Sequence, residues 1–188
     1  ELRYGSESNA YRVRVLGEFP LSDDNTIIPY HLVEAAQNRD VVVSDEAMIV
    51  WGLDVARFGS DATALCKRQG PIVTELRSWR GLDLMQTTGR IVAEYEALAP
   101  SKRPTEILVD SIGVGSGVVD RLQELGLPVR GVNVAESPSM GATYMNLRSE
   151  LWFKCKAWLE DRSCKLPKDD QLIAELTAIR YSFTSTAK

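Results

Sequence analysis

Two short apolar segments, each carrying an aspartate at its end, place the strongest constraint on the fold. Asp54 interrupts the otherwise uncharged run 48–56, and Asp110 ends the run 107–110, which opens into the glycine-containing turn 111–117. Runs this short, bounded by charged or glycine-rich residues, are typical of buried strands. An ionised carboxylate buried alone costs several kcal/mol, so each aspartate must meet water or a cation. If the strands are parallel neighbours, both carboxylates lie at one sheet edge, which suits a divalent metal.

The remaining hydrophobic patterns predict the order of elements around these two strands. Three strands joined by short turns form an antiparallel meander, and helical crossovers then lead to two further strands. The expected strands cover 48–55, 61–68, 72–79, 105–110 and 129–134, and the expected helices cover 82–98, 118–125, 145–161 and 171–178. This order predicts an α/β fold of the ribonuclease-H-like kind: a mixed five-stranded sheet, with an antiparallel meander plus parallel strands and helices on both faces.

The segments that flank these elements are expected to pack on the main domain rather than to form domains of their own. Residues 1–46 are interpreted as a lead-in that packs on the main domain, 47–188, with an alternating strand pattern at 11–16 and a short helix at 28–36. A last strand is predicted at 179–183. The chain begins without Met and stops as this strand ends, which indicates a piece of a longer polypeptide, so we expect the domain to be incomplete at its C-terminal end.

Composition narrows the class of protein. The 188 residues carry a formal charge of -4 with a pI of about 5.2, so a nucleic-acid partner would have to meet a local basic patch. Three cysteines without a CxxC spacing are interpreted as reduced thiols, and the single His31 cannot build a histidine-rich zinc site. We also expect no membrane partner, because no apolar run approaches the roughly twenty residues that span a bilayer.

Asp54 and Asp110 are the candidate metal ligands. Two carboxylates side by side repel each other, and a Mg²⁺ or Mn²⁺ ion removes that repulsion. Two such ions would activate water and stabilise the leaving oxygen in phosphodiester cleavage. Asp61 is the nearest further catalytic candidate, because it begins the second strand and could return beside Asp54; a plain turn residue is the alternative. Singly, each aspartate could equally cap a turn at a strand end.

Two other features have simple structural explanations. Asp169 and Asp170 precede an apolar helix and are interpreted as helix N-terminal caps. The glycine-rich turn 113–117 could hold a phosphate on its backbone N–H groups, or it could simply be a tight strand-to-helix connection.

The two aspartate motifs carry a resemblance to a known family. Residues 51–61, together with 108–115, resemble the C-terminal nuclease domain of a tailed-bacteriophage terminase large subunit, and the resemblance covers most of the chain. It implies a ribonuclease-H-like fold related to Holliday-junction resolvases. It also implies a Mg²⁺- or Mn²⁺-dependent endonuclease that cuts concatemeric double-stranded DNA during packaging, with Asp54 as the first-strand ligand and Asp110 as the fourth-strand ligand.

The resemblance also implies parts that these residues do not supply. The family's third acidic ligand lies on a helix after the last strand, so we expect it beyond Lys188. The ATPase domain of the same polypeptide would precede residue 1, and no phosphate-binding GxxxxGK[ST] motif occurs here. The implied partners are double-stranded DNA, that ATPase domain, the portal and the small terminase subunit. The implied location is the host cell cytoplasm, transiently at the procapsid.

DNA approaching an acidic sheet edge requires basic side chains around it. Arg57, three residues past Asp54, and Arg80 are the preferred DNA-binding candidates. Each basic residue could equally be a solvated surface charge. The wider set of candidates is Arg57, Arg80, Arg148, Lys154, Lys156 and Lys188.

Two other functions remain open at this point. An actin-like ATPase or sugar-kinase half-domain shares the meander, the strand-end aspartate and a later glycine-rich turn, although such proteins need two related domains. A non-catalytic docking module of a packaging motor would bind its partner without metal.

Overall fold

We describe a computed structural model of the chain, covering residues 25–56, 61–141 and 143–182. A single mixed sheet forms its centre, with strand order β3-β2-β1-β4-β5. The β1–β2 and β2–β3 pairs are antiparallel, and the β1–β4 and β4–β5 pairs are parallel. The strands are β1 (Ile49–Asp54), β2 (Ala62–Gln69), β3 (Ile72–Arg80), β4 (Glu106–Asp110) and β5 (Val129–Val132).

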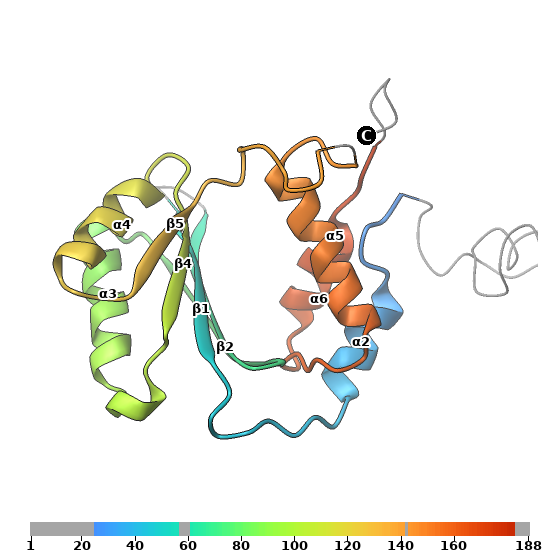
Figure 1. Cartoon of the computed structure of the whole chain (residues 1–188), viewed down its shortest axis with the longest axis horizontal. Helices are drawn as coiled ribbons and strands as arrows, with labels where there is room; N and C mark the ends of the chain where they lie inside the picture. The colour runs from blue at the N-terminus through green and yellow to red at the C-terminus, as the bar shows by residue number, and fades with distance from the viewer. Residues whose placement is uncertain (1–24, 57–60, 142, 183–188) are drawn as a thin grey trace, which may run out of the picture.

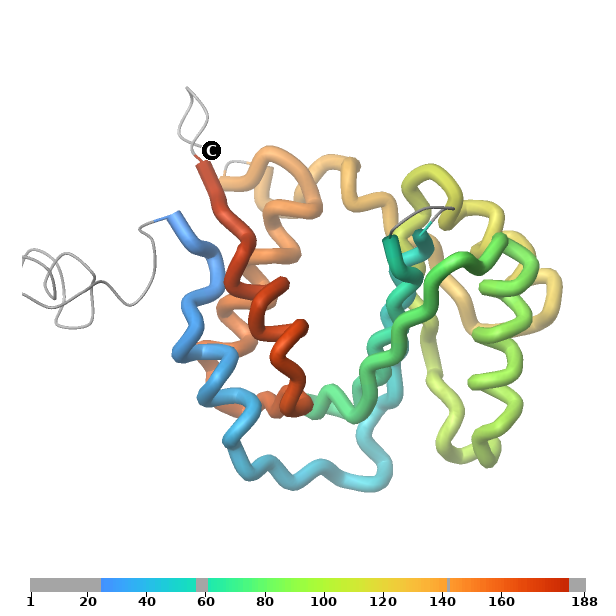
Figure 2. Tube along the Cα trace, turned by 180° about the vertical axis from the view of Figure 1, so that it is seen from behind, coloured from blue at the N-terminus to red at the C-terminus, as the bar shows by residue number. Residues whose placement is uncertain are grey.

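Helices cover both faces of this sheet (Figure 1). On one face lie the two crossover helices, and on the other lies a layer of three helices from the two ends of the chain (Figures 1 and 2). The first pair is α3 (Leu84–Glu96) and α4 (Gly115–Glu124), with the 3₁₀ turn η2 (Pro100–Lys102) between them; the second group is α2 (Tyr30–Asn38), α5 (Leu147–Glu160) and α6 (Asp170–Ala178). The predicted ribonuclease-H-like architecture is confirmed.

Side-chain alternation along the strands explains this layering. In β1, Trp51 and Leu53 are buried, whereas Gly52 and Asp54 are not. In β4, Ile107 and Val109 are buried in the same way and join the cluster that includes Trp51 and Leu53. Successive strand residues point to opposite faces, so the sheet is apolar toward α3 and α4 and partly polar toward α5 and α6.

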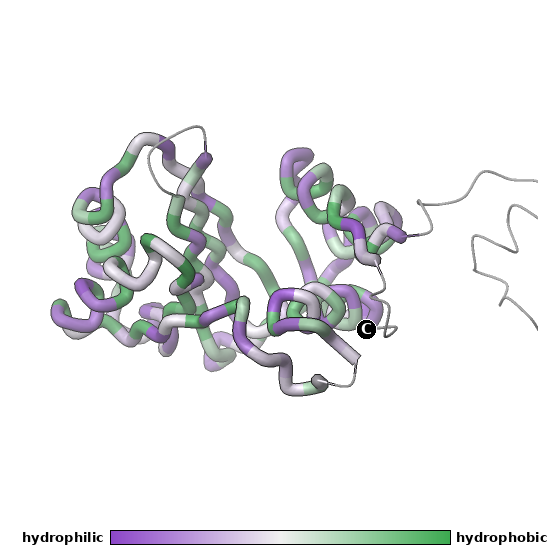
Figure 3. Tube along the Cα trace, turned by 90° about the horizontal axis from the view of Figure 1, so that it is seen from above, coloured by the Kyte–Doolittle hydropathy of each residue, from purple (hydrophilic) through white to green (hydrophobic). Residues whose placement is uncertain are grey.

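A second hydrophobic cluster holds α2, α5 and α6 together. It contains Val33 of α2, Leu159 of α5 and Val73 of β3, and Leu172 of α6 packs against it. The backbone of Lys165 both donates to Pro71 and accepts from Val73, which ties the α5–α6 connection to the β2–β3 turn. The helical layer therefore contacts the sheet at this turn, and Figure 3 shows the layer to one side of the sheet.

The element boundaries agree with local sequence signals. Asp83 begins α3 with a capping box shared with Gln86. Asp169 caps α6 by accepting from the Leu172 N–H, as predicted, whereas Asp170 is the first residue of the helix itself. Gly126, at φ 78°, follows α4, where the left-handed conformation favours glycine. The boundary between a lead-in at 1–46 and a domain at 47–188 stays a prediction, although α2 packs on α5 and α6.

One predicted element was wrong. The described part of 179–183 is not a strand of the sheet: Arg180 forms only an isolated antiparallel bridge with Thr26, and Tyr181 N–H donates to the Asn25 carbonyl. The reason is that α6 lies in the helical layer, so the residues that follow it lie beside residues 25–28 and not at a sheet edge. The predicted strand at 11–16 lies outside the described residues.

Candidate active site

The two candidate ligands lie at the ends of neighbouring strands. Gly52 pairs with Leu108 and Leu53 with Val109 in the parallel β1–β4 ladder, so Asp54 and Asp110 are the next residues in register. Neighbouring strands are about 4.8 Å apart, and residues in the same register point to the same face. Both aspartates therefore project on the face away from the buried Leu53 and Val109.

Asp110 is held in place by the turn that follows it. Its Oδ1 accepts a hydrogen bond from the Ile112 N–H at 3.0 Å, and Gly113 adopts a φ of 66°. Gly115 then begins α4 so close to β4 that a Cβ there would overlap the carbonyl oxygen of Asp110. These contacts support the interpretation of the turn 113–117 as a tight strand-to-helix connection.

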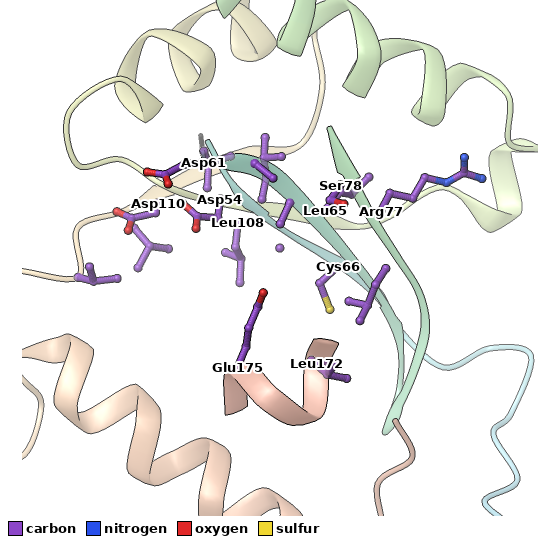
Figure 4. Close-up of a pocket in the computed structure, with 18 of the residues that line it drawn as sticks. Asp54, Asp61, Leu65, Cys66, Arg77, Ser78, Leu108, Asp110, Leu172 and Glu175 are labelled. Carbon is purple, nitrogen blue, oxygen red and sulfur yellow. The ribbon is translucent and has the colours of Figure 1, made fainter. Parts of the chain in front are cut away.

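Asp61 joins the pair from the start of the second strand. It immediately precedes β2, which returns antiparallel to β1 with Ala64 opposite Asp54, and the Ala56 N–H donates to the Thr63 hydroxyl. Figure 4 shows the carboxylates of Asp54, Asp61 and Asp110 at one end of a cavity. The three predicted acids therefore line the same cavity.

The closeness of the other carboxylates affects the pKa of Asp54. The pKa of Asp54 is raised above its ordinary value, first by partial desolvation and then by the negative charge of Asp110, with Asp61 adding to the effect. The Arg148 guanidinium acts in the opposite direction. Asp54 is therefore a carboxylate whose ionised form would be stabilised by an added cation.

The acids lie at one end of a cavity of about 950 Å³ between the sheet and the α5–α6 layer, which we call the acidic cavity. Its sheet wall comes from the strand residues that face away from α3 and α4, including Gly52, Cys66 and Leu108. Leu172 and Glu175 of α6 form part of the opposite wall, and Figure 4 shows Glu175 directed toward the sheet. The other named contributors are Leu53, Ala62, Ala64, Leu65, Leu76, Arg77, Ser78, Arg80, Val109, Arg130, Val132, Val134, Leu147, Leu151, Asp169 and Gln171.

The donor set fits a hard divalent cation only in part. Carboxylate oxygens are the ligands that Mg²⁺ and Mn²⁺ prefer, and two of them on adjacent strands can share an ion. Within the part of the chain that the structure describes, however, no three histidine, cysteine or carboxylate side chains come close enough together to hold one. Asp54 and Asp110 therefore supply an incomplete set of ligands.

The predicted basic residues occupy different positions. Arg80 ends β3 opposite Ala62 and lines the acidic cavity, whereas Lys154 is paired with Glu150 at 2.6 Å. Lys156 lies 3.9 Å from Glu160 along α5. Arg57 and Lys188 lie outside the described residues. Arg148 is exposed at the first turn of α5 and acts electrostatically on Asp54.

The chain resembles known proteins in structure rather than in sequence. No protein-family model and no curated protein sequence matches the chain. Among solved structures, the nuclease domain of the large terminase subunit gp2 of bacterial virus Sf6 aligns with a TM-score of 0.69 at 18% identity, covering 86% of this chain and 85% of that one. The large terminase nuclease from thermophilic phage G20c aligns with a TM-score of 0.65 at 15% identity, covering 87% and 86%.

The chain has the fold of phage terminase nuclease domains. The resemblance predicted from the two aspartate motifs is thereby confirmed at the level of the fold. Related structures of the same two terminase nucleases were determined with manganese, calcium, cobalt, magnesium or zinc.

Sequence reasoning missed several residues of the candidate site. Leu147 and Leu151 lie on the predicted helix 145–161 but were not assigned to the site; both line the acidic cavity, and Leu151 is exposed. Glu175 was not considered, because α6 was interpreted only through its N-terminal cap. Glu150 was overlooked although it is fully buried. The one available signal was a charged residue on the apolar side of the predicted helix 145–161, beside Leu147, Leu151 and Trp158.

Proposed function

We propose that this chain is the metal-dependent endonuclease domain of a phage DNA-packaging terminase and that it cuts concatemeric double-stranded DNA. The observation that carries the proposal is the placement of Asp54 and Asp110 in register at the ends of adjacent parallel strands, facing the acidic cavity. The shared fold with terminase nuclease domains supports it.

In this proposal Asp54 and Asp110 hold Mg²⁺ or Mn²⁺, two ions in the complete site. A bound ion of this kind lowers the pKa of a water molecule and neutralises charge on phosphate oxygens. The chain's part is to present oxygens in a fixed position: the Ile112 N–H orients the Asp110 carboxylate, and the strand register sets Asp54 beside it. Asp61, at the start of β2, adds a third negative charge near Asp54.

The partners follow from the same proposal. They are double-stranded DNA, an ATPase domain of the same polypeptide, the portal and the small terminase subunit, in the host cell cytoplasm. Within the described residues no helix is long and apolar enough to cross a bilayer.

The decisive experiment is cleavage of supercoiled plasmid DNA in Mn²⁺ with single-carboxylate variants. Asp54→Asn and Asp110→Asn should each lower the cleavage rate by at least 10²-fold, since each removes a ligand charge without changing side-chain size. Asp120→Asn is the matched control, because Asp120 is an exposed carboxylate of α4. Asp61→Asn tests its catalytic role. Cleavage by both ligand variants at the parent rate would refute the assignment.

Two further measurements on the same protein test the other two candidate functions. ATP-dependent thermal stabilisation would favour an actin-like ATPase or kinase half-domain. Metal-independent binding to a portal or a partner subunit, with no Mn²⁺ binding, would favour a docking module.

A further inference from the structure

The first turn of α5 is fastened to the segment that leaves β5. Asp110 pairs with Val132 in the β4–β5 ladder, and two residues later the Val134 carbonyl accepts a hydrogen bond from the Arg148 N–H at 2.9 Å. The Leu147 N–H likewise donates to the Glu136 carbonyl. The backbone of Arg148 is therefore held at a fixed position with respect to the strand pair that carries Asp110.

A second anchor holds the loop between β5 and α5. The buried Glu150 carboxylate accepts from the backbone N–H of Ser139 at 2.6 Å and also from its hydroxyl, and it pairs with Lys154 at 2.6 Å. The Asn146 side chain caps α5 by accepting from the Ser149 N–H. These bonds fix the loop and the helix start together, so Arg148 extends from a rigid support.

The side chain of Arg148 faces the acids across a hollow. Arg148 and Asp110 line a second cavity of about 230 Å³, together with Val134, Leu151 and Trp152. Within the described residues no ion pair or side-chain hydrogen bond holds the Arg148 guanidinium, although its charge is felt at Asp54. A guanidinium carries five N–H donors in a fork that matches phosphate oxygens, so one left unpaired opposite two carboxylates is suited to an anion held between them.

The other basic side chains are less suited to this position. Lys154 is occupied by Glu150, and Lys156 lies further along α5 near Glu160. Arg80 is on β3, which β2 separates from the strand of Asp54. Arg130 is bound to Glu106 at 2.6 Å. Arg80 and Arg148 each share a cavity with a candidate ligand and have no paired carboxylate among the described residues, but only Arg148 comes from the α5 side, across from the strand ends.

We propose that Arg148 binds the DNA phosphate at the cutting position, opposite the cation held by Asp54 and Asp110. This inference rests on the proposed nuclease function and adds a substrate-binding residue to it. Arg148 supplies donors from the α5 side while the carboxylates hold the cation on the sheet side, so the phosphate is gripped between the two walls.

The test measures DNA affinity separately from metal binding. A short duplex is titrated with the chain in Ca²⁺, an ion found with one of the similar nuclease domains, and anisotropy is recorded at several salt concentrations with the duplex checked for integrity. Arg148→Ala should weaken binding roughly tenfold, as expected for loss of one charge-assisted hydrogen bond, and should reduce the salt slope by about one. Arg148→Lys should keep the salt slope but recover only part of the affinity.

Arg121→Ala is the matched control, because Arg121 pairs with Glu124 on the exposed surface of α4 and should leave both measurements unchanged. Mn²⁺ binding, followed by thermal shift, should not weaken in Arg148→Ala. Altered Mn²⁺ binding with unchanged DNA affinity would make Arg148 a counter-ion of the aspartates and would overturn the inference, as would unchanged DNA affinity alone.

Failure of the proposed function has a different signature. If the parent chain binds no Mn²⁺ and Asp54→Asn changes nothing, the nuclease proposal fails and the role of Arg148 fails with it. If the parent binds Mn²⁺ and cuts DNA while Arg148→Ala equals it in DNA affinity, only the role of Arg148 is overturned.

Discussion

At the scale of single residues, the buried carboxylate of Glu150 and the exposed carboxylate of Asp54 differ in how their charges are compensated. Glu150 is fully satisfied by Lys154 and Ser139, so its charge is compensated within the fold. Asp54 lies beside Asp110 with its ionised form disfavoured, so its charge is left to be compensated by a cation. We infer that the first is structural and the second functional.

Glu150 should make stability depend on acidic pH. Its hydrogen bonds from Lys154 and Ser139 lower its pKa from 4.5 to about 2. A depressed carboxyl pKa contributes stability that is present above the unfolded value near 4.5 and is lost as pH falls toward 2. Glu150→Gln should therefore be less stable than the parent at pH 7, and the difference should shrink between pH 4.5 and pH 2.

Thermal unfolding by circular dichroism across this pH range checks the prediction. Glu160→Gln is the control, because Glu160 is exposed at the end of the same helix and makes only a long contact with Lys156. A pH-independent difference between Glu150→Gln and the parent would contradict the assignment of the buried ion pair.

At the scale of elements, the β4–α4 connection sets the position of the second ligand. This connection spans only six residues, Asp110 to Gly115. They include the end of β4, the hydrogen bond from the Ile112 N–H to the Asp110 carboxylate, and the start of α4, which packs against β4. Only glycine fits at the helix start, because any side chain would collide with the Asp110 backbone.

Gly115→Ala and Gly117→Ala should separate this packing from helix propensity. A Cβ at Gly115 would lie 2.9 Å from the Asp110 carbonyl carbon, so the strand end must shift; we expect destabilisation of about 1–3 kcal/mol and more than tenfold loss of Mn²⁺-dependent cleavage. A Cβ at Gly117 meets only Leu84 Cδ1 at 3.4 Å, so alanine there should stabilise the helix by about 0.5–1 kcal/mol. Denaturant unfolding and plasmid cleavage measure the two effects. Equal behaviour of the variants would count against the ligand position of Asp110.

At the scale of the whole molecule, the sheet separates an apolar core from the face that borders the acidic cavity. One cluster fills the space toward α3 and α4, whereas the helical layer meets the opposite face at the β2–β3 turn and leaves the acidic cavity beside the strand ends. With a net charge of -4, the proposed DNA binding would depend on local cations. The proposed cation would reduce the local negative charge before DNA arrives.

A cation shared by two strands should stabilise the folded chain as a whole, because the unfolded chain does not hold Asp54 and Asp110 together. At a Mn²⁺ concentration about 100 times Kd, the expected gain is about 2.7 kcal/mol, or a rise in Tm of about 5–10 °C. The chelator EDTA should reverse it, and Asp54→Asn should abolish it, while Asp120→Asn should not. Scanning fluorimetry measures the shift, and a shift that survives in Asp54→Asn would place the ion elsewhere.

Much of the fold could be predicted because its signals are local. Apolar runs identify strands, Asp83 and Asp169 identify helix starts, and Gly126 identifies a helix end through bonds only a few residues apart. The pairing of Asp54 with Asp110 was also accessible, because parallel strands joined by crossovers bring their carboxyl ends to one edge. The predicted strand at 179–183 failed because the destination of that segment depends on where α6 packs.

The sequence by itself therefore determined most of the elements, the mixed five-stranded sheet and the two strand-end acids of this protein. The tertiary structure alone decided that Arg148 faces those acids, that Glu150 is buried beneath the β5–α5 loop, and that α6 walls the acidic cavity with Glu175. The physical reason is the sequence separation of the interacting residues. Strand and helix patterns arise from neighbours within a few residues. The positions of Arg148, Glu150 and Glu175 depend instead on how the layer of α2, α5 and α6 packs against the sheet.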